Sequence, residues 1–233
     1  MTVPSHLAII MDGNGRWAEK NDLARREGHK QGVDVLKDVI KESQTLGISC
    51  LTVYAFSTEN WKRPRLEVKF LMKLFQQTLR SEAQELNENE VQVHIIGRRK
   101  GLPEYLLNEI DYIENLTENN SGLQLNIAFN YGGRAELVDT FKKVIKENDS
   151  TDFKIDDINE EKIHNHLYNS DYPEVELLIR TGGELRLSNF LLWEIAYAEL
   201  YFTDKFWPEF KRKDLRKAVK DFQRRDRRFG TIE

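Results

Sequence analysis

The chain has 233 residues, of which 39% are hydrophobic and 32% are charged, and its formal net charge is −4. This balance supports a sizeable core with a well-solvated surface, and it argues against a dedicated nucleic-acid-binding protein, which would carry a basic excess. No apolar stretch approaches the ~20 residues that a membrane-spanning helix needs. The one cysteine, Cys50, cannot form a disulfide within the chain, which predicts a reducing location, the cytoplasm.

Six apolar runs of strand length recur along the chain, and several are rich in Val, Ile and Tyr. They occupy residues 7–11, 50–56, 91–97, 123–131, 175–180 and 198–204. Helical spacing of apolar residues is clearest over 67–87. A second predicted helix follows Gly133 and carries an apolar stripe of Leu137, Phe141, Val144 and Ile145. Strands that alternate with helices predict an α/β fold with a mainly parallel sheet covered on both faces.

Four of the predicted strands are followed by loops rich in Gly, Asn, Arg or Ser, at the edge where parallel sheets bind their ligands. The first loop reads MDGNGRW and contains the pattern G-x-G-x-x-A, formed by Gly13, Gly15 and Ala18. Glycines in such a loop let backbone N–H groups converge on an anion. A tight turn that binds nothing has the same spacing, so the pattern alone leaves both possibilities open.

Asp12 stands at the mouth of this first loop, where its carboxylate would repel a bound phosphate. A dinucleotide site would need an acidic residue about 20 positions later at the end of the next strand, but that strand ends near Ser57. A calcium-binding EF-hand loop does not fit, because Arg16 and Leu23 would occupy its fifth and twelfth positions. The charges are reconciled if Asp12 binds a divalent metal ion that faces a diphosphate.

Three further segments carry side chains suited to a diphosphate. FSTENWKRP, residues 56–64, places hydroxyl, amide, indole and guanidinium groups together at a strand end. Arg25 and His29 lie four residues apart and would share a helix face. RTGGELRLSN, residues 180–189, supplies two arginines, whose guanidinium groups bind phosphate oxygens bidentately. Each segment taken alone is also compatible with an ordinary polar turn or surface loop.

Other motifs give weaker signals, and the Walker sequence of P-loop nucleotide-binding proteins is absent. DDINE, residues 156–160, imitates the aspartate-rich box of the all-helical prenyl transferases. It precedes a helical pattern and is interpreted as a helix cap at the end of a polar surface loop, residues 146–161. The basic segment 211–230 is interpreted as a solvated helix face, with attraction to anionic lipid headgroups as the alternative.

Five segments together resemble the cis-prenyltransferases, and most closely the bacterial undecaprenyl diphosphate synthases among them. They are HLAIIMDGNGRWA, the GH at 28–29, YAFSTENWKRP, FNYGGR and IRTGGELRLSNFLLWEIAYAELYFTDKFWPEF. The resemblance runs from about His6 to Gly230. It implies one α/β catalytic domain over residues 1–233, with a six-stranded, mainly parallel sheet flanked by helices and a hydrophobic tunnel, and not a true Rossmann fold. Apolar residues of 70–86 and of LQLNIAF are candidates for the tunnel walls.

The resemblance also implies roles for individual residues. Asp12 would bind the metal ion needed for catalysis, and Glu199 would be the second magnesium-associated carboxylate. Asn60 would assist proton removal, although a neutral amide alone is a poor base. The residues expected to bind the two diphosphate substrates are Gly13, Asn14, Gly15, Arg16, Trp17, Arg25, His29, Ser57, Thr58, Glu59, Trp61, Arg63, Arg180, Arg186, Leu187 and Ser188. Among these, Arg180, Arg186 and Ser188 would hold isopentenyl diphosphate.

The implied activity is a Mg²⁺-dependent condensation of isopentenyl diphosphate units, in cis, onto an allylic diphosphate such as farnesyl diphosphate. The expected product is a long-chain polyprenyl diphosphate such as undecaprenyl diphosphate, the lipid-carrier precursor for cell-wall synthesis. The expected form is a cytoplasmic homodimer with peripheral contact to the membrane surface and no nucleic-acid partner. Two alternatives stay open. A non-catalytic binding subunit would be expected to lack Asp12 or the terminal arginines, and a dinucleotide-dependent oxidoreductase would bind NAD tightly.

Overall fold

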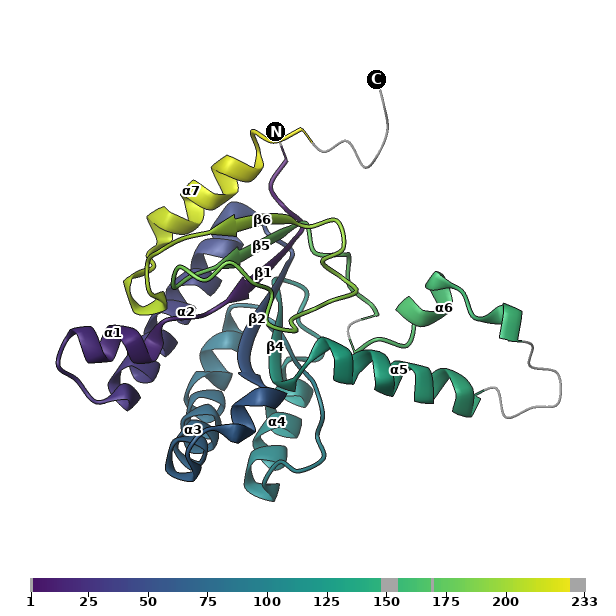
Figure 1. Ribbon diagram of the computed structural model, residues 1–233, viewed down its shortest axis with the longest axis horizontal. Coiled ribbons are helices and arrows are strands. Elements are labelled where there is room, and N and C mark those ends of the chain that lie inside the picture. Colours follow the sequence, from purple (N-terminus) through teal and green to yellow (C-terminus); the bar gives the residue numbers. More distant parts are fainter. Residues whose placement is uncertain (1, 148–154, 169, 227–233) are drawn as a thin grey trace.

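The computed structural model describes residues 2–147, 155–168 and 170–226. Its centre is a sheet of six strands that all run parallel, in the order β3-β4-β2-β1-β5-β6 (Figure 1). The strands are β1 (His6–Ile10), β2 (Cys50–Ser57), β3 (Gln92–Ile96), β4 (Gln124–Tyr131), β5 (Leu177–Arg180) and β6 (Glu199–Phe202). Each strand overlaps one of the six apolar runs of the sequence, so the α/β class and the parallel sheet are confirmed.

Seven α-helices of the described residues flank this sheet. They are α1 (Asn14–Lys20), α2 (Arg25–Leu46), α3 (Arg65–Glu88), α4 (Glu104–Thr117), α5 (Gly133–Glu147), α6 (Glu160–His164) and α7 (Arg212–Phe222). The helix predicted over 67–87 is α3, and its apolar spacing is the reason it was readable in the sequence. Within the described ranges, no helix combines the length and apolar character needed to cross a membrane.

The two faces of the sheet are covered differently. The larger core lies on the face that packs against α2, α3, α4 and α7, and β1 contributes Leu7 and Ile9 to it. Ala8 and Ile10 point to the opposite face, because successive side chains of a strand alternate. That smaller core is closed in part by residues 187–198, which form turns and bends and no regular helix. The prediction of cover on both faces is therefore confirmed, with long helices concentrated on one of them.

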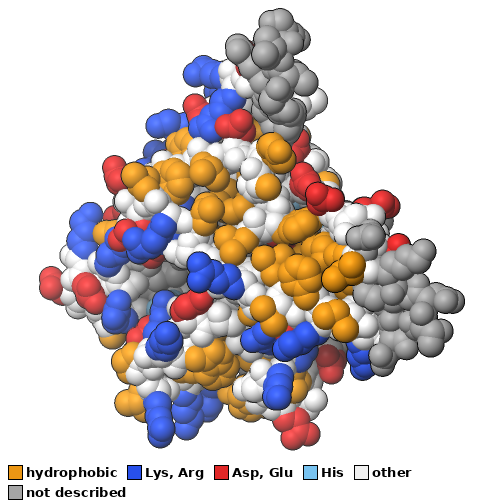
Figure 2. Space-filling view, turned by 45° about the vertical axis from the view of Figure 1, so that its right-hand side comes forward, with side chains coloured by type: hydrophobic (Ala, Val, Ile, Leu, Met, Phe, Trp, Pro, Cys, Tyr) orange, Lys and Arg blue, Asp and Glu red, His pale blue; other side chains and the backbone are white. Residues whose placement is uncertain are grey.

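Helix α5 is rotated relative to the apolar stripe that the sequence shows. Its buried positions include Glu136, Thr140 and Val144, whereas Phe141 and Ile145 are 46% and 62% exposed. The rotation follows from the polar contacts of Glu136, which draw that side of the helix inward. Figure 2 shows hydrophobic side chains gathered on the side of the molecule where α5 lies. The helix thus leaves part of its apolar stripe uncovered by this chain.

Two carboxyl groups are buried beside the smaller core. The Tyr131 hydroxyl and the Tyr168 N–H both donate hydrogen bonds to Glu136, the latter at 2.9 Å. Glu194 is 3% exposed, and neither of its carboxyl oxygens has a hydrogen-bond partner among the described residues. Burial raises the pKa of Glu194 to about 8 and also raises the pKa of Glu136. Glu194 must therefore take up a proton when the chain folds at neutral pH.

Replacing Glu194 with Gln should stabilise the fold, and by more at pH 8 than at pH 5. Because the pKa of Glu194 is higher in the folded chain, the unfolded chain releases the Glu194 proton at lower pH. The free energy of unfolding of the wild type therefore falls as the pH rises from about 4.5 to about 8. Gln has no such proton to take up. We expect a gain of about 1–3 kcal/mol at pH 8 in the free energy of unfolding, measured by urea titration. The exposed Glu104 of α4, changed to Gln, is the control. Equal gains at both pH values would contradict the expectation.

Two sequence interpretations concern segments that are described only in part. In the polar loop predicted over 146–161, residues 148–154 lie outside the described residues. The capping interpretation is confirmed, because the Asn159 side chain accepts a hydrogen bond of 2.8 Å from the Lys162 N–H at the start of α6. In the basic segment 211–230, the described part forms α7. Two of its arginines pair with acidic residues of α2, since Arg212 contacts Asp38 at 2.6 Å and Arg216 contacts Glu42 at 2.5 Å.

Candidate active site

The loops that follow β1, β2 and β5 meet at the carboxyl edge of the sheet and line a cavity of about 620 Å³. Most of the residues predicted to form the site line this cavity. They are Asp12, Gly13, Asn14, Gly15, Arg16, Arg25, His29, Ser57, Glu59, Asn60, Arg63, Arg180, Arg186 and Ser188. The fold therefore brings together four segments whose residues are separated by up to 176 positions in the sequence.

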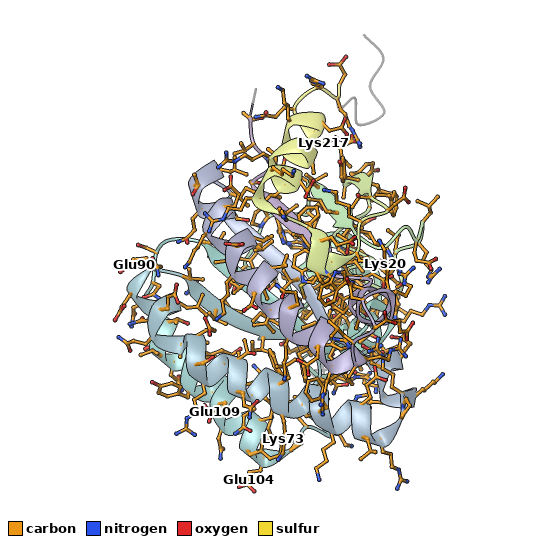
Figure 3. All side chains as sticks on the ribbon, turned by 90° about the vertical axis from the view of Figure 1, so that its left-hand side faces the viewer. Lys20, Lys73, Glu90, Glu104, Glu109 and Lys217 are labelled. Atoms are coloured by element: carbon orange, nitrogen blue, oxygen red, sulfur yellow. The ribbon has the colours of Figure 1, made fainter. Side chains whose placement is uncertain are left out.

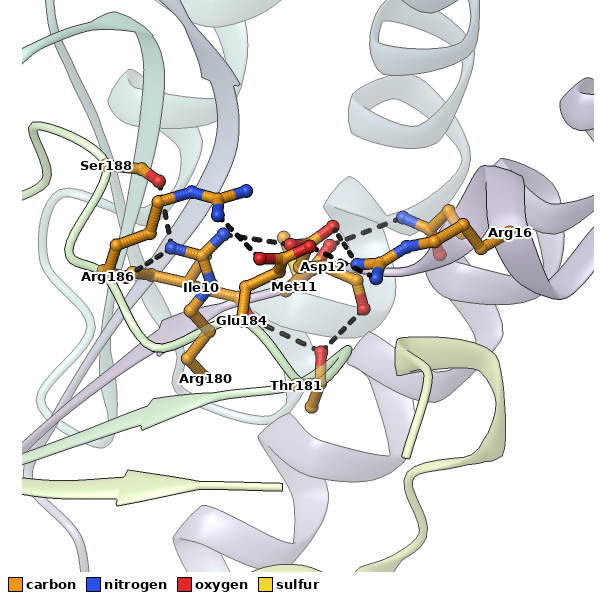
Figure 4. A network of polar contacts seen from close by, with 10 residues as sticks. Ile10, Met11, Asp12, Arg16, Arg180, Thr181, Glu184, Arg186 and Ser188 are labelled. Atoms are coloured by element: carbon orange, nitrogen blue, oxygen red, sulfur yellow. Dashed lines mark hydrogen bonds and ion pairs between the residues drawn. The ribbon is translucent and has the colours of Figure 1, made fainter. Parts of the chain in front are cut away.

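Asp12 connects the two arginine-bearing sides of the cavity (Figure 4). Its Oδ2 accepts a hydrogen bond of 2.9 Å from Arg180 Nη2, and its Oδ1 lies 3.2 Å from Arg16 Nη2. The Thr181 hydroxyl donates to the Asp12 carbonyl oxygen at 2.7 Å, which ties the end of β5 to the end of β1. The carboxylate is thus held between a cation of the first loop and a cation of the last loop.

Glycines allow the first loop to turn this sharply and to pack this closely. Gly13 has φ +105°, and a Cβ there would lie 2.7 Å from Phe206 Cδ1, so neither the backbone conformation nor the space suits another residue. A Cβ at Gly28 would lie 2.0 Å from the Asn14 carbonyl oxygen. The absence of side chains at these two positions brings α2 against α1 and places Arg25 and His29, one turn apart, beside the loop.

His29 is partly buried beside two arginines. Burial is the main cause that lowers its pKa to about 4, and the positive charges of Arg63 and Arg25 lower it further. His29 lines the cavity, and its ring can donate a hydrogen bond to a ligand there. The positive charge of this side of the cavity comes from the arginines.

The loop after β5 is organised around Arg180, whose side chain is only 4% exposed. Its Nη1 donates to the Ser188 hydroxyl at 2.8 Å and to the Arg186 carbonyl oxygen. Arg186 itself is exposed and contacts the Glu184 carboxylate at 2.5 Å, while the other oxygen of Glu184 lies 3.4 Å from Arg16. Glu184 thus occupies the two cations that a bound diphosphate would need.

In the loop after β2, Asn60 has a structural partner of its own. Its side-chain oxygen accepts a hydrogen bond of 3.2 Å from the Ser57 N–H, which caps the short 3₁₀ helix Thr58–Lys62. Arg63 follows this turn and pairs with Glu67 of α3 at 3.0 Å. The amide of Asn60 is therefore oriented toward the loop backbone, which makes it a weak candidate for a base.

Asn189 is a contact residue that sequence reasoning missed. Its side-chain nitrogen donates to Glu59 at 2.9 Å, its side-chain oxygen accepts from the Arg134 N–H at 2.8 Å, and its carbonyl accepts from the Gly133 N–H at 2.7 Å. Its φ of +62° is unusual for a residue other than glycine. The position of Asn189 in RTGGELRLSN was visible, but partners 55 to 130 residues away were not. Asn189 joins the loop after β5 to the loop after β2.

The structure does not bring Glu199 to Asp12. Glu199 is the first residue of β6 and pairs in register with Leu177, whereas the cavity begins at Arg180, the last residue of β5. Glu199 therefore lies three residues before the end of the strands where the cavity begins, which is about 10 Å along the sheet. The Glu199 carboxylate contacts Arg225 at 2.7 Å. Glu199 and Asp12 therefore lie toward opposite ends of the strands within this chain, and the metal role of Glu199 stays a prediction.

Four other predicted site residues do not line the cavity. Trp17 lies on α1, Thr58 and Trp61 lie in the 3₁₀ helix, and Leu187 packs against the smaller core. The Trp61 indole donates to the Asn130 side chain at 2.7 Å and is 40% exposed. None of these four residues lines the cavity, and their contact with a substrate stays a prediction.

The donor set fits a magnesium ion that is bound together with a substrate. The described residues contain no cluster of three or more His, Cys, Asp or Glu side chains that could enclose a metal ion. Asp12 provides one carboxylate, 30% exposed, in a cavity lined by five arginines. Mg²⁺ is commonly held by one or two carboxylates together with substrate phosphates. Asp12 would therefore hold the ion only when a diphosphate supplies further oxygens.

A second, apolar cavity of about 150 Å³ adjoins the polar one, and Met11, His29, Phe56 and Leu71 line both. It lies between α2, α3 and the sheet. Its walls include the predicted tunnel residues of α3 and β4, namely Leu71, Leu74, Phe75, Leu79, Leu86, Leu125, Ile127 and Phe129. The predicted hydrophobic tunnel is therefore present, and it begins where the arginine-lined cavity ends.

Comparison with known proteins places this geometry in a family. A family model described as putative undecaprenyl diphosphate synthase matches residues 10–230. The isoprenyl transferase of Fusobacterium nucleatum is 48% identical over 99% of this chain and 97% of its own length, and that of Thermotoga maritima is 48% identical over 100% and 99%.

Solved structures agree with the sequence relatives. Lavandulyl diphosphate synthase from Lavandula x intermedia, in complex with dimethylallyl diphosphate, has a TM-score of 0.95 and 39% identity over 98% of this chain and 99% of its own. A probable undecaprenyl diphosphate synthase from Campylobacter jejuni has a TM-score of 0.84 and 32% identity over 99% and 100%. The chain is a prenyltransferase and belongs to the undecaprenyl diphosphate synthase family.

Proposed function

We propose that this prenyltransferase condenses isopentenyl diphosphate, in cis, with an allylic diphosphate and repeats the reaction to make a long-chain polyprenyl diphosphate. One observation carries the proposal: a cavity lined by Arg16, Arg25, Arg180 and Arg186 opens directly beside an apolar tunnel. Such a pair of cavities suits two diphosphate headgroups and one growing hydrocarbon chain. The related synthase from Lavandula binds dimethylallyl diphosphate, an allylic diphosphate, which supports the same substrate class here.

The two headgroups are assigned to opposite sides of Asp12. Arg16, Arg25 and the backbone of the first loop would hold the allylic diphosphate and stabilise the negative charge that grows on it as it leaves. Arg180, Arg186 and Ser188 would hold isopentenyl diphosphate, with Arg180 oriented by Asp12. When bound, Mg²⁺ would supply additional positive charge at the leaving diphosphate. Fixing both substrates side by side contributes to the rate through orientation.

The double bond of isopentenyl diphosphate then attacks the allylic carbon, and a proton leaves the new chain. Asn60 is hydrogen-bonded to the Ser57 N–H, and a neutral amide is a poor base. We therefore assign the proton to a diphosphate oxygen or a water molecule near Asn60 and Ser57, with Asn60 shaping the loop. His29, which lines the cavity, would donate a hydrogen bond to the headgroup.

The finer substrate and assembly are also part of this proposal. Farnesyl diphosphate is the expected starter and undecaprenyl diphosphate the expected product, which would serve as a lipid-carrier precursor for the cell wall. The family description and the tunnel support this choice. The exposed Phe141 and Ile145 of α5 support a homodimer that forms through that helix. The expected location is the cytoplasm, at the membrane surface. Sedimentation equilibrium would contradict the dimer if the purified chain were monomeric.

A condensation assay tests the proposed function. Purified protein is mixed with ¹⁴C-isopentenyl diphosphate and either farnesyl or dimethylallyl diphosphate, with Mg²⁺ or with EDTA, and extracted products are sized by chromatography. We expect EDTA-sensitive label in polyprenyl products that are longer than the starter. Folded protein that incorporates no label from any starter would contradict the proposal and favour a non-catalytic binding subunit.

Replacing Arg186 with Ala should mainly weaken the binding of isopentenyl diphosphate. Arg186 is exposed at the cavity and can form a bidentate contact with a headgroup. We expect KM for isopentenyl diphosphate to rise about 10- to 100-fold, with a much smaller change in KM for the allylic substrate. Arg212→Ala, an exposed arginine on α7 far from the cavity, is the control. An unchanged KM for isopentenyl diphosphate would contradict the assignment.

A further inference from the structure

The outer wall of the apolar tunnel has an unusual composition. Figure 3 shows α2 and α3 running next to each other across this face of the molecule. On the sheet side the tunnel is lined by Phe56, Leu125 and Ile127, but on the outer side it is lined by polar residues of both helices. Three contacts bridge the helices in succession: Lys37 Nζ to Glu82 Oε1 at 2.7 Å, Lys41 Nζ to Glu85 Oε1 at 2.7 Å, and Gln44 Nε2 to the Asn89 carbonyl at 2.9 Å.

These bridges close the seam between α2 and α3 only weakly. Lys41 and Glu85 are each 50% exposed, and Lys37 is 39% exposed while its partner Glu82 is 15% exposed. Ion pairs of this exposure contribute little net stability and are screened by salt. On its other side, α3 faces α4 and is held by apolar packing. Buried residues of both helices, such as Leu79 of α3 and Leu106 of α4, belong to the same core. The seam toward α2 is therefore the side of the tunnel that opens most easily.

The length of the tunnel can be compared with the length of its contents. Both helices lead away from the arginine-lined cavity, and an α-helix rises about 1.5 Å per residue. Lys37 therefore lies about 18 Å below Arg25, and Gln44 about 28 Å below it. An extended three-unit starter spans about 14 Å, and an eleven-unit chain about 40 Å or more. The starter ends above the first ion pair, whereas a long product extends beyond the last bridge.

We propose that the α2–α3 seam is the exit of the tunnel and that the pairs Lys37–Glu82 and Lys41–Glu85 limit product length. A growing chain would reach the first pair after a few condensations, and further growth along the wall formed by the pairs would part the two helices at the seam. The energy needed to separate the pairs would oppose each further addition, so that release competes with elongation. This inference rests on the proposed elongation activity and assigns the control of its product length to four residues of the seam.

The test removes the charges and keeps the side-chain volumes. We would compare the wild-type chain with K37M/E82Q, with K41M/E85Q, and with the combination of all four changes. The fraction of product longer than the main wild-type product should rise about two- to fivefold, and most in the combined variant. The charge-swapped variant K37E/E82K should restore the wild-type distribution. R212M/D38N is the matched control, since it removes an ion pair of α2 that does not line the tunnel.

Ionic strength provides a second measurement. Raising the salt concentration should lengthen wild-type products, because salt screens exposed pairs. The combined variant should show no such shift, although salt affects diphosphate binding in both proteins. Identical product distributions in the wild type and the combined variant, or an equal shift in the control, would overturn the proposal. If the wild-type protein forms no polyprenyl product at all, the proposed function itself has failed, and this is distinguishable from an unchanged length.

Discussion

Replacing Asp12 with Ala should lower turnover by about 10³-fold. The carboxylate has two tasks in the proposed mechanism. It orients Arg180 through a contact of 2.9 Å, and it is the carboxylate that we propose holds Mg²⁺ beside the leaving diphosphate. The loss should appear in kcat with farnesyl diphosphate and isopentenyl diphosphate both saturating. Steady-state kinetics over a range of Mg²⁺ concentrations is the measurement.

Asp12→Asn separates the two tasks of Asp12. The amide oxygen can still accept the hydrogen bond of Arg180, which is almost fully buried and would otherwise lose its partner carboxylate. We expect Asp12→Asn to unfold at nearly the wild-type temperature and to remain as inactive as Asp12→Ala, because the charge is lost. Near wild-type turnover in a folded Asp12→Asn protein would contradict the metal role.

Replacing Arg180 with Lys should reduce kcat/KM by about 10²- to 10³-fold although the positive charge is kept. One guanidinium contacts Asp12, Ser188 and the Arg186 carbonyl at the same time. A lysine ammonium is a compact charge without this planar fork, so it cannot satisfy all three partners. The loop after β5 should then hold isopentenyl diphosphate in a poor orientation. We also expect a loss of about 1–3 kcal/mol in the free energy of unfolding, because a largely buried contact is broken.

Arg186→Lys is the comparison for Arg180→Lys. Arg186 is exposed, so lysine there should cost less activity and almost no stability. The measurements are kcat and KM for isopentenyl diphosphate and the free energy of unfolding in urea, compared between the two variants. Equal, small effects at the two positions would show that Arg180 contributes only charge and would contradict its orienting role.

The fold was predictable because its signals are local. Each strand of the sheet is a short apolar run such as that of β1, and α3 shows apolar residues three and four positions apart over most of its length. The rotation of α5 was not predictable, since Phe141 and Val144 look alike in a periodic pattern. Their different burial depends on the hydrogen bonds of Glu136 to Tyr131 and Tyr168. Local pattern defines the element, and distant contacts decide which face it buries.

The site was predictable to the extent that its chemistry lies at strand ends. Asp12, Arg16, Arg180 and Ser188 follow strands whose carboxyl ends meet at one edge of the sheet. Glu199 looked equally suitable as a carboxylate in the sequence, but it begins its strand and so lies toward the other edge. The contacts of Glu184 and Asn189 could not be read either, because they depend on residues more than 50 positions away.

The central claim is that one chain holds two diphosphates at once, on either side of Asp12. Isothermal titration calorimetry with farnesyl thiodiphosphate, an unreactive analogue, followed by isopentenyl diphosphate in the presence of Mg²⁺, tests this claim most directly. We predict one molecule of each ligand per chain, with Arg16→Ala weakening the first and Arg186→Ala the second. Mutual displacement of the two ligands from a single site would contradict the account.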